Sequence, residues 1–282
     1  MNLSQFSHQI LAGPLAFHAP SFTPWLAKQE TLAQRIASMP ADRQAFEWLA
    51  DFVNQRQPYE VRDGLAYIHI NDVLSTDTTA VDRALGMTDY AQVVAELQQA
   101  VEDPAVTAIR LNVNSPGGSA IGAPDAADAV LAARQQKPVV THIGSLGASA
   151  AIYLVAASSA ILTQRSSIVG SIGTISTFLD FSQLMSRIGI TPHIFTAEAS
   201  DLKAAANPYR PPTLEQANFL QSRVDTLNAD FLKWMQTHRA NAETSSMRGQ
   251  WFTGAEALNL GLVDQLGTAA DADAAARALA GM

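Results

Sequence analysis

The chain contains no cysteine among its 282 residues. Disulfide bonds, thiolate metal sites and a cysteine nucleophile are therefore excluded. Positive charge is also scarce, because 18 Lys and Arg residues face 26 Asp and Glu residues and leave a net charge of −8. This balance argues against non-specific nucleic-acid binding. Lysine itself occurs only at Lys28, Lys137, Lys203 and Lys233.

No Asp, Glu, Lys or Arg occurs in residues 138–164, a stretch long enough to span a bilayer. Polar residues and glycines interrupt it, among them Thr141, His142, Gly147 and Ser149. A succession of strand, turn and helix fits this stretch better than a membrane helix. The N-terminus also lacks the basic region of a signal peptide. We therefore expect a soluble cytoplasmic protein with no membrane partner.

Apolar segments alternate between strand and helix character along most of the chain. The segments 64–73 and 106–113 read as strands around a helix at 88–102, and such a β-α-β unit implies parallel strands. The alternation continues with helices near 121–135, from Ala150 onward and near 178–188, and with strands near 139–143, 159–163 and 191–196. This pattern predicts a multi-layer α/β fold.

Residues 1–60 are expected to form a helical N-terminal extension, and residues 61–282 one main domain. A long helix is expected from Thr213, because Thr213 and Gln216 have the spacing of a capping box. Its apolar residues have near-heptad spacing, which indicates core or subunit packing. A short helix should follow Thr253 and stop at Gly261.

The strand at residues 139–143 leads into a stretch of small residues and then into Ser149. A serine at a strand–turn–helix corner lies near free backbone N–H groups and the positive end of the helix dipole. A nucleophile for acyl transfer needs such donors for the developing oxyanion. The alternative is that Ser149 only caps the helix.

Three further segments could complete such a site. The loop 114–119 contains Pro116, Gly117 and Gly118 and could offer backbone N–H groups to a carbonyl. Ser171 lies between two glycines. Lys203 lies among small apolar residues, where burial would lower its pKa and free the amine as a general base. A plain tight turn and a surface-loop lysine are the alternatives.

Together these segments resemble the signal peptide peptidase A (SppA) family of serine peptidases, and within it the phage capsid-maturation branch. The resemblance covers roughly residues 60–270 and rests on five motifs in the family's order. They are Asn114-Ser115-Pro116-Gly117-Gly118, Ala148-Ser149-Ala150-Ala151 with Tyr153, Gly170-Ser171-Ile172-Gly173, Lys203 with Asn207-Pro208-Tyr209, and Phe252-Thr253-Gly254-Ala255-Glu256-Ala257 with Gly261-Leu262-Val263-Asp264. Many relatives carry Gly-Gly after the serine, where this chain has Ala150-Ala151.

The resemblance implies a ClpP/crotonase-like fold and a Ser–Lys dyad without metal or cofactor. Ser149 would be the nucleophile, Lys203 the general base and Ser171 the residue that orients the lysine. The N–H groups of Gly118 and Ala150 would form the oxyanion hole. The resemblance also implies a homo-oligomer and a protein or peptide substrate, with capsid, scaffold or portal proteins in an assembling phage head as the expected ones.

Other functions remain open at this stage. An SppA-like peptidase could degrade signal peptides or other short peptides in a cell. A crotonase-type acyl-CoA enzyme would need neither Ser149 nor Lys203. A Ser-His-Asp peptidase is disfavoured because the first histidine after Ser149 is His193, and both His142 and His193 are expected to be packed strand residues. A structural capsid or portal component would tolerate loss of the dyad.

Overall fold

The computed structural model describes residues 15–17, 59–79, 82–83 and 86–282. Their strands form one mixed sheet, whose main path has the order β10-β7-β6-β5-β3-β2. The pairs along the path from β10 to β3 are parallel, and β2 pairs antiparallel with β3. This mostly parallel sheet with its crossover helices confirms the α/β prediction and has the ClpP/crotonase-like fold.

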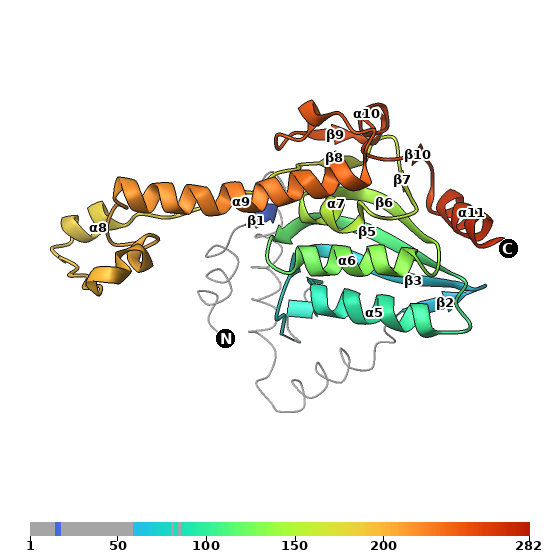
Figure 1. Cartoon of the computed structure of the whole chain (residues 1–282), viewed down its shortest axis with the longest axis horizontal. Coiled ribbons are helices and arrows are strands. Elements are labelled where there is room, and N and C mark those ends of the chain that lie inside the picture. The colour runs from blue at the N-terminus through green and yellow to red at the C-terminus, as the bar shows by residue number, and fades with distance from the viewer. Residues whose placement is uncertain (1–14, 18–58, 80–81, 84–85) are drawn as a thin grey trace.

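Three crossover helices cover one face of the sheet (Figure 1). The elements are β3 (Leu65–Ser75), α5 (Tyr90–Glu102), β5 (Ala108–Ser119), α6 (Ala123–Arg134), β6 (Val139–Ala148), α7 (Ala150–Val155) and β7 (Ala160–Thr163). Their apolar residues form the main core, in which Ile68, Leu111 and Ile143 are fully buried. A second, smaller cluster that includes Leu65, Ala108 and Val140 also draws on these strands, so the sheet is covered on both faces.

The C-terminal helix α11 (Ala269–Ala280) covers the other face and packs on β3, β5 and β6. The fully buried Arg110 lies beneath it. Its Nε atom pairs with Oδ1 of Asp273 at 3.1 Å, and the Tyr67 hydroxyl donates to the second carboxylate oxygen. The α11 helix thus brings its own carboxylate to a charge that would otherwise lie unpaired in the core.

Shorter elements complete the sheet and its borders. They are β1 (Leu15–Phe17), β2 (Glu60–Arg62), β4 (Thr88–Asp89), β8 (Ile168–Gly170), η2 (Thr244–Ser246), β9 (Trp251–Thr253), α10 (Gly254–Asn259) and β10 (Gln265–Leu266). The expected short helix after Thr253 is α10, which begins with a capping box to Glu256. Gly261 follows it with φ 72°, in the left-handed region that glycine adopts at low cost.

The segment 174–220 projects from the sheet and is called the arm below (Figure 1). It carries α8 (Ser182–Arg187), the 3-10 helix η1 (Glu198–Ala204) and the first part of α9 (Leu214–His238). The capping box of Thr213 with Gln216 is confirmed. The predicted strand at 191–196 is wrong: these residues form no regular element and are mostly exposed, because no sheet edge reaches the arm.

Two further predictions concern the end of β6 and the N-terminal residues. The turn expected after residue 143 is absent, since β6 runs on to Ala148 and pairs there with β8. The predicted helical extension 1–60 lies outside the described residues except for residues 15–17 and 59–60, which are parts of strands or a bend. In the described ranges, every helix falls short of the length and apolar character that a membrane crossing requires.

Candidate active site

Ser149 occupies the junction between β6 and α7. Its backbone has φ 56° and ψ −121°, a conformation that residues other than glycine seldom adopt. The cost of such backbone strain is about 1–3 kcal/mol, and it is tolerated where the surrounding structure holds it. The turn is sharp because the strand must enter the helix within one residue, and it points a small polar side chain into the corner.

The hydroxyl of Ser149 has no hydrogen-bond partner among the described residues. The whole residue is buried, with 0 % of its surface exposed. Ser149 stands at the N-cap position of α7, yet its side chain makes no capping hydrogen bond. The alternative that Ser149 only caps the helix is therefore wrong. A buried unpaired hydroxyl costs about 1–3 kcal/mol, which calls for a functional explanation.

The glycine loop reaches the same end of the sheet. At Gly118 the chain lies so close to β3 that an added Cβ would fall 1.9 Å from the Leu74 carbonyl oxygen. Only glycine allows this approach. Ala150 is the first residue of α7, so its N–H has no acceptor within the helix. The glycine loop, at the C-terminal end of β5, and the start of α7, at the C-terminal end of β6, therefore lie at the same end of the sheet.

Ser115 fixes the loop, a role that the sequence did not reveal. Its hydroxyl donates to the Asp72 carbonyl oxygen at 2.6 Å and accepts from the Gly117 N–H at 3.1 Å. Asp72 itself has φ 54°, at the irregularity where the register of β3 and β5 shifts. The motif contained Ser115, but its partner lies 43 residues earlier in the chain. Only the pairing of β3 with β5 brings the two together.

Ser171 lies beside Ser149 in the fold. The Ser149 N–H donates to the Gly170 carbonyl oxygen at 2.8 Å, and the Ser171 N–H donates to the Gln250 carbonyl oxygen at 2.5 Å. Ser171 also has a positive φ of 53° and is buried. The two serines predicted from separate motifs therefore lie in neighbouring turns that a backbone hydrogen bond joins. Both have the strained backbone that is typical of functional sites.

An aromatic cluster holds α7 against α9. The Tyr153 ring stacks on Trp234 at 5.6 Å between ring centroids and meets Phe231 edge-on at 4.9 Å. The Trp234 indole N–H donates to the Tyr153 carbonyl oxygen at 2.9 Å. Burial, together with the carboxylate of Asp230, raises the pKa of the Tyr153 hydroxyl. Such paired aromatic contacts fix the helix whose first residue follows Ser149.

Lys203 is not joined to Ser149 within this chain. It lies in η1 on the arm, where it is exposed, and η1 packs on α9. The expected burial of Lys203 is therefore not met in the single chain. Figure 1 shows the arm extending away from the sheet that carries α7. The structure thus places Ser149, Ala150 and Ser171 at one corner, with Gly118 at the same end of the sheet, and leaves the lysine on a projecting surface.

The two histidines differ from one another. His142 is buried in β6, and its Nε2 lies 3.3 Å from the Gly267 carbonyl oxygen, as expected for a packed strand residue. Burial lowers its pKa. His193 was expected in a strand, and this is wrong, because it lies exposed on the arm. Neither histidine donates to or accepts from the Ser149 hydroxyl, which has no hydrogen-bond partner in the part of the chain that the structure describes.

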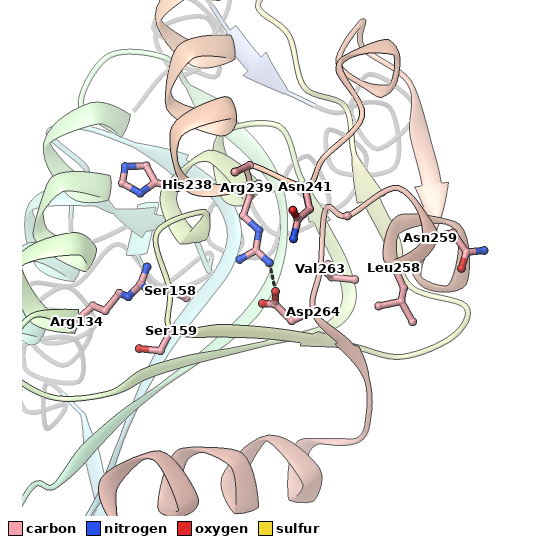
Figure 2. A pocket seen from close by; sticks show the side chains of 12 residues that line it. Arg134, Ser158, Ser159, His238, Arg239, Asn241, Leu258, Asn259, Val263 and Asp264 are labelled. Carbon is pink, nitrogen blue, oxygen red and sulfur yellow. Dashed lines mark hydrogen bonds and ion pairs between the residues drawn. The ribbon is translucent and has the colours of Figure 1, made fainter.

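A polar cavity of about 510 Å³ lies at the far end of α7 from Ser149, near Ser158 and Ser159 (Figure 2). Its cations already have partners: Arg239 pairs with Asp264, and Arg134 donates to the Ala157 carbonyl oxygen at 3.1 Å. Burial and the nearby Arg134 lower the pKa of His238, which also lines it. Because α6, α9 and α10 end around it, these cations offset the negative ends of helices. The cavity is therefore a capping region and no part of the serine corner.

Comparison with known proteins places these features in a family context. The sequence pattern of peptidase family S49 matches residues 132–282. The chain is 33% identical over 186 residues to "Putative protease MJ0651" of Methanocaldococcus jannaschii, covering 65% of this chain and 58% of that protein. It is 30% identical to "Capsid assembly protease C" of Escherichia phage lambda, covering 79% and 51%. It is also 30% identical to "Head-tail preconnector protein GP5" of Enterobacteria phage P21, covering 80% and 45%. The chain spans about half the length of these relatives.

Proposed function

Because this chain belongs to peptidase family S49, we propose that it is a serine endopeptidase and that Ser149 is its nucleophile. The unpaired hydroxyl of the buried Ser149, held at a strained corner before α7, is the observation that carries the proposal. A hydroxyl without a partner is available to a base and to a substrate carbonyl. A merely structural serine in this position would cap the helix.

In the proposed reaction, the Ser149 oxygen attacks the carbonyl carbon of a peptide bond while a base removes its proton. The N–H groups of Gly118 and Ala150 then stabilise the oxyanion of the tetrahedral intermediate. Each such donor is worth about 2.7–4 kcal/mol of barrier. The base returns its proton to the leaving amine, and water hydrolyses the acyl-enzyme by the same route.

We assign the base to Lys203 of the partner subunit, with Ser171 orienting its amine. Two observations support this assignment. The Ser149 hydroxyl has no hydrogen-bond partner among the described residues of its own chain, and Lys203 is exposed on a projecting arm. Burial at a subunit contact would remove water from the ammonium group and lower its pKa, as a general base at neutral pH requires.

The surface of the arm supports a homo-oligomer. Large apolar side chains are exposed there, including Phe195 at 92 % and Leu214 at 79 % of their surface, together with Leu179, Leu184, Ile188 and Ile190. Soluble monomers seldom expose this many apolar side chains on one projection. The arm of one copy covering the serine corner of the next would bury this surface and complete the site at once.

We propose that the substrates are capsid, scaffold or portal proteins and that cleavage occurs in an assembling phage head in the host cytoplasm. Two phage relatives, one named as a capsid assembly protease, align with about four-fifths of the chain and support this substrate class. A peptidase acting on signal peptides or other short peptides in a cell is the second candidate. The 29% identity over 189 residues to "Putative signal peptide peptidase SppA" of Enterococcus faecium supports this candidate.

Mass spectrometry of the neighbouring head proteins after co-expression tests the proposal. Wild type should leave defined cuts that Ser149→Ala abolishes. Ser145→Ala is the matched control, because Ser145 is an exposed serine of β6, the strand that leads to Ser149. This variant should cut like wild type. Cleavage of unstructured peptides without cuts in head proteins would favour the second candidate. Absence of any hydrolysis and of any reaction with a fluorophosphonate would reject the peptidase.

A further inference from the structure

The strand β1 occupies a defined edge of β5. β3 takes one edge of β5 and follows it as far as the pair Leu74 and Gly118. β6 takes the opposite edge but leaves it after the pair Ser115 and Gly147. β1 pairs antiparallel with residues 117–119, with Ala16 opposite Gly118. Since β3 already fills one edge at Gly118, β1 must fill the edge that β6 vacates.

That edge adjoins the serine corner. From Gly147, β6 continues for one residue and then reaches Ser149. β1 therefore runs between the glycine loop and the strand that leads to Ser149, and Figure 1 shows it beside the end of β5. Full burial of Ser149 is consistent with a covered corner. A short segment of the chain's own backbone thus lies along the residues assigned to the oxyanion hole.

An extended peptide substrate would need the same edge. Peptides that add to a sheet use main-chain hydrogen bonds to one exposed strand, and a strand edge can pair with only one partner at a time. For the carbonyl of a substrate to reach both Gly118 and Ser149, its backbone must run along residues 117–119. We propose that Leu15–Phe17 is an internal pseudosubstrate, which occupies the substrate edge of β5 and is displaced when a peptide binds. This inference rests on the proposed function.

Tethering explains how three residues can hold the edge. A tethered segment has an effective concentration on the order of millimolar, so even millimolar intrinsic affinity gives substantial occupancy. A free peptide with more contacts would still displace it. The segment therefore acts as a competitor: it raises KM for peptides by about two- to tenfold and leaves kcat unchanged.

The variant Ala16→Pro tests this in the full-length oligomer, because proline removes a backbone donor and disrupts strand pairing. With a peptide ending in Ala-Ala-Phe-aminomethylcoumarin as probe, KM should fall about two- to tenfold at constant kcat. An added octapeptide with the sequence of residues 13–20 should restore the higher KM. The same octapeptide with N-methyl groups at the positions of Leu15, Ala16 and Phe17 should leave KM low. It keeps the side chains but has lost the backbone N–H donors that strand pairing requires.

Hydrogen exchange separates failure of this inference from failure of the proposed function. The backbone amides of residues 117–119, which pair with β1, should exchange faster in Ala16→Pro than in wild type, whether or not the protein cleaves anything. Unchanged exchange and unchanged KM would overturn the pseudosubstrate. A Ser149-dependent cut within residues 13–20, seen by intact-mass measurement of the wild type, would also overturn it, because the segment would then be a substrate. If neither wild type nor Ala16→Pro cleaves any peptide, but the variant still exchanges faster, the result rejects the peptidase and not the pairing of β1 with β5.

Discussion

The backbone N–H of Ser149 donates a 2.8 Å hydrogen bond to the carbonyl oxygen of Gly170. This bond ties the strained corner to the turn that carries Ser171. It also continues the parallel pairing of β6 with β8, in which Ala148 lies opposite Gly170. The conformation of the nucleophile therefore depends on a glycine 21 residues later in the chain, and this dependence can be tested.

Gly170→Ala should inactivate the protein. Gly170 has φ 119°, and an added Cβ would lie 2.8 Å from the Gln250 carbonyl oxygen. The turn must shift, and the expected loss of stability is about 1–3 kcal/mol with a larger loss of activity. Gly173→Ala is the control, since its nearest contact would be 3.7 Å away. Urea unfolding and peptide hydrolysis measure the two effects. Equal activity of the two variants would contradict the coupling.

Gly118→Ala should destroy the oxyanion loop, because the added Cβ would collide with the backbone of Leu74. We expect loss of activity together with a lower midpoint of thermal unfolding. Gly144→Ala, in β6, offers a matched comparison because its nearest contact would be a carbonyl oxygen 3.8 Å away. It should keep near-wild-type stability and hydrolysis. An active Gly118→Ala enzyme would remove Gly118 from the oxyanion hole.

Complementation tests the lysine in trans. Ser149→Ala and Lys203→Ala should each be inactive, but equal amounts unfolded and reassembled together should regain roughly a quarter of wild-type activity if each site joins two copies. Mixed oligomers then contain corners with an intact Ser149 and an intact partner lysine. No recovery, despite co-assembly seen by native mass spectrometry, would place the base in the same chain.

Replacement by arginine addresses the chemistry of the base itself. Lys203→Arg keeps the positive charge and much of the length, yet arginine does not release its proton near neutral pH. The variant should assemble like wild type. Its kcat for peptide hydrolysis should fall at least about a hundredfold, because the general base is removed. Size-exclusion chromatography and peptide hydrolysis are the two readouts. Retained hydrolysis would rule out Lys203 as the base.

Glu96 should make stability depend on pH. It is buried in α5, and burial raises its pKa from 4.5 to about 7, although Gln92 donates a hydrogen bond to it. The folded state therefore binds this proton more tightly than the unfolded state. Its contribution is favourable at low pH, declines as pH rises from about 4.5 to 7, and stays at the lower level above that range.

Glu96→Gln should consequently be more stable than wild type at pH 8 by up to about 3 kcal/mol, and nearly equal to it at pH 4.5. Urea unfolding at the two pH values measures the difference. Glu102→Gln, at the exposed end of the same helix, should change stability little at either pH. A stabilisation of Glu96→Gln that is the same at both pH values would contradict the role of its ionisation.

The sequence was sufficient for the order of elements because that information is local. Alternating apolar runs predicted β3, α5, β5 and α6, the capping box at Thr213 marked the start of α9, and the short helix after Thr253 was also expected. The strand at 191–196 failed for the complementary reason. A strand needs a partner edge, and residues 191–196 lie on an arm that no edge reaches. A local apolar pattern carries no information about the presence of a partner.

The site divides in the same way. The sequence by itself determined which residue types stand at the corner and in which order, since Ser149, Ser171 and the glycine loop follow short motifs. Tertiary structure alone decided that the Ser149 hydroxyl is unpaired, that both serines have positive φ, and that Lys203 is exposed. It alone brought Leu15–Phe17 onto residues 117–119. These features depend on contacts between segments that are distant in the sequence. The pairing of strands decides which segments meet, and no local sequence motif records that pairing.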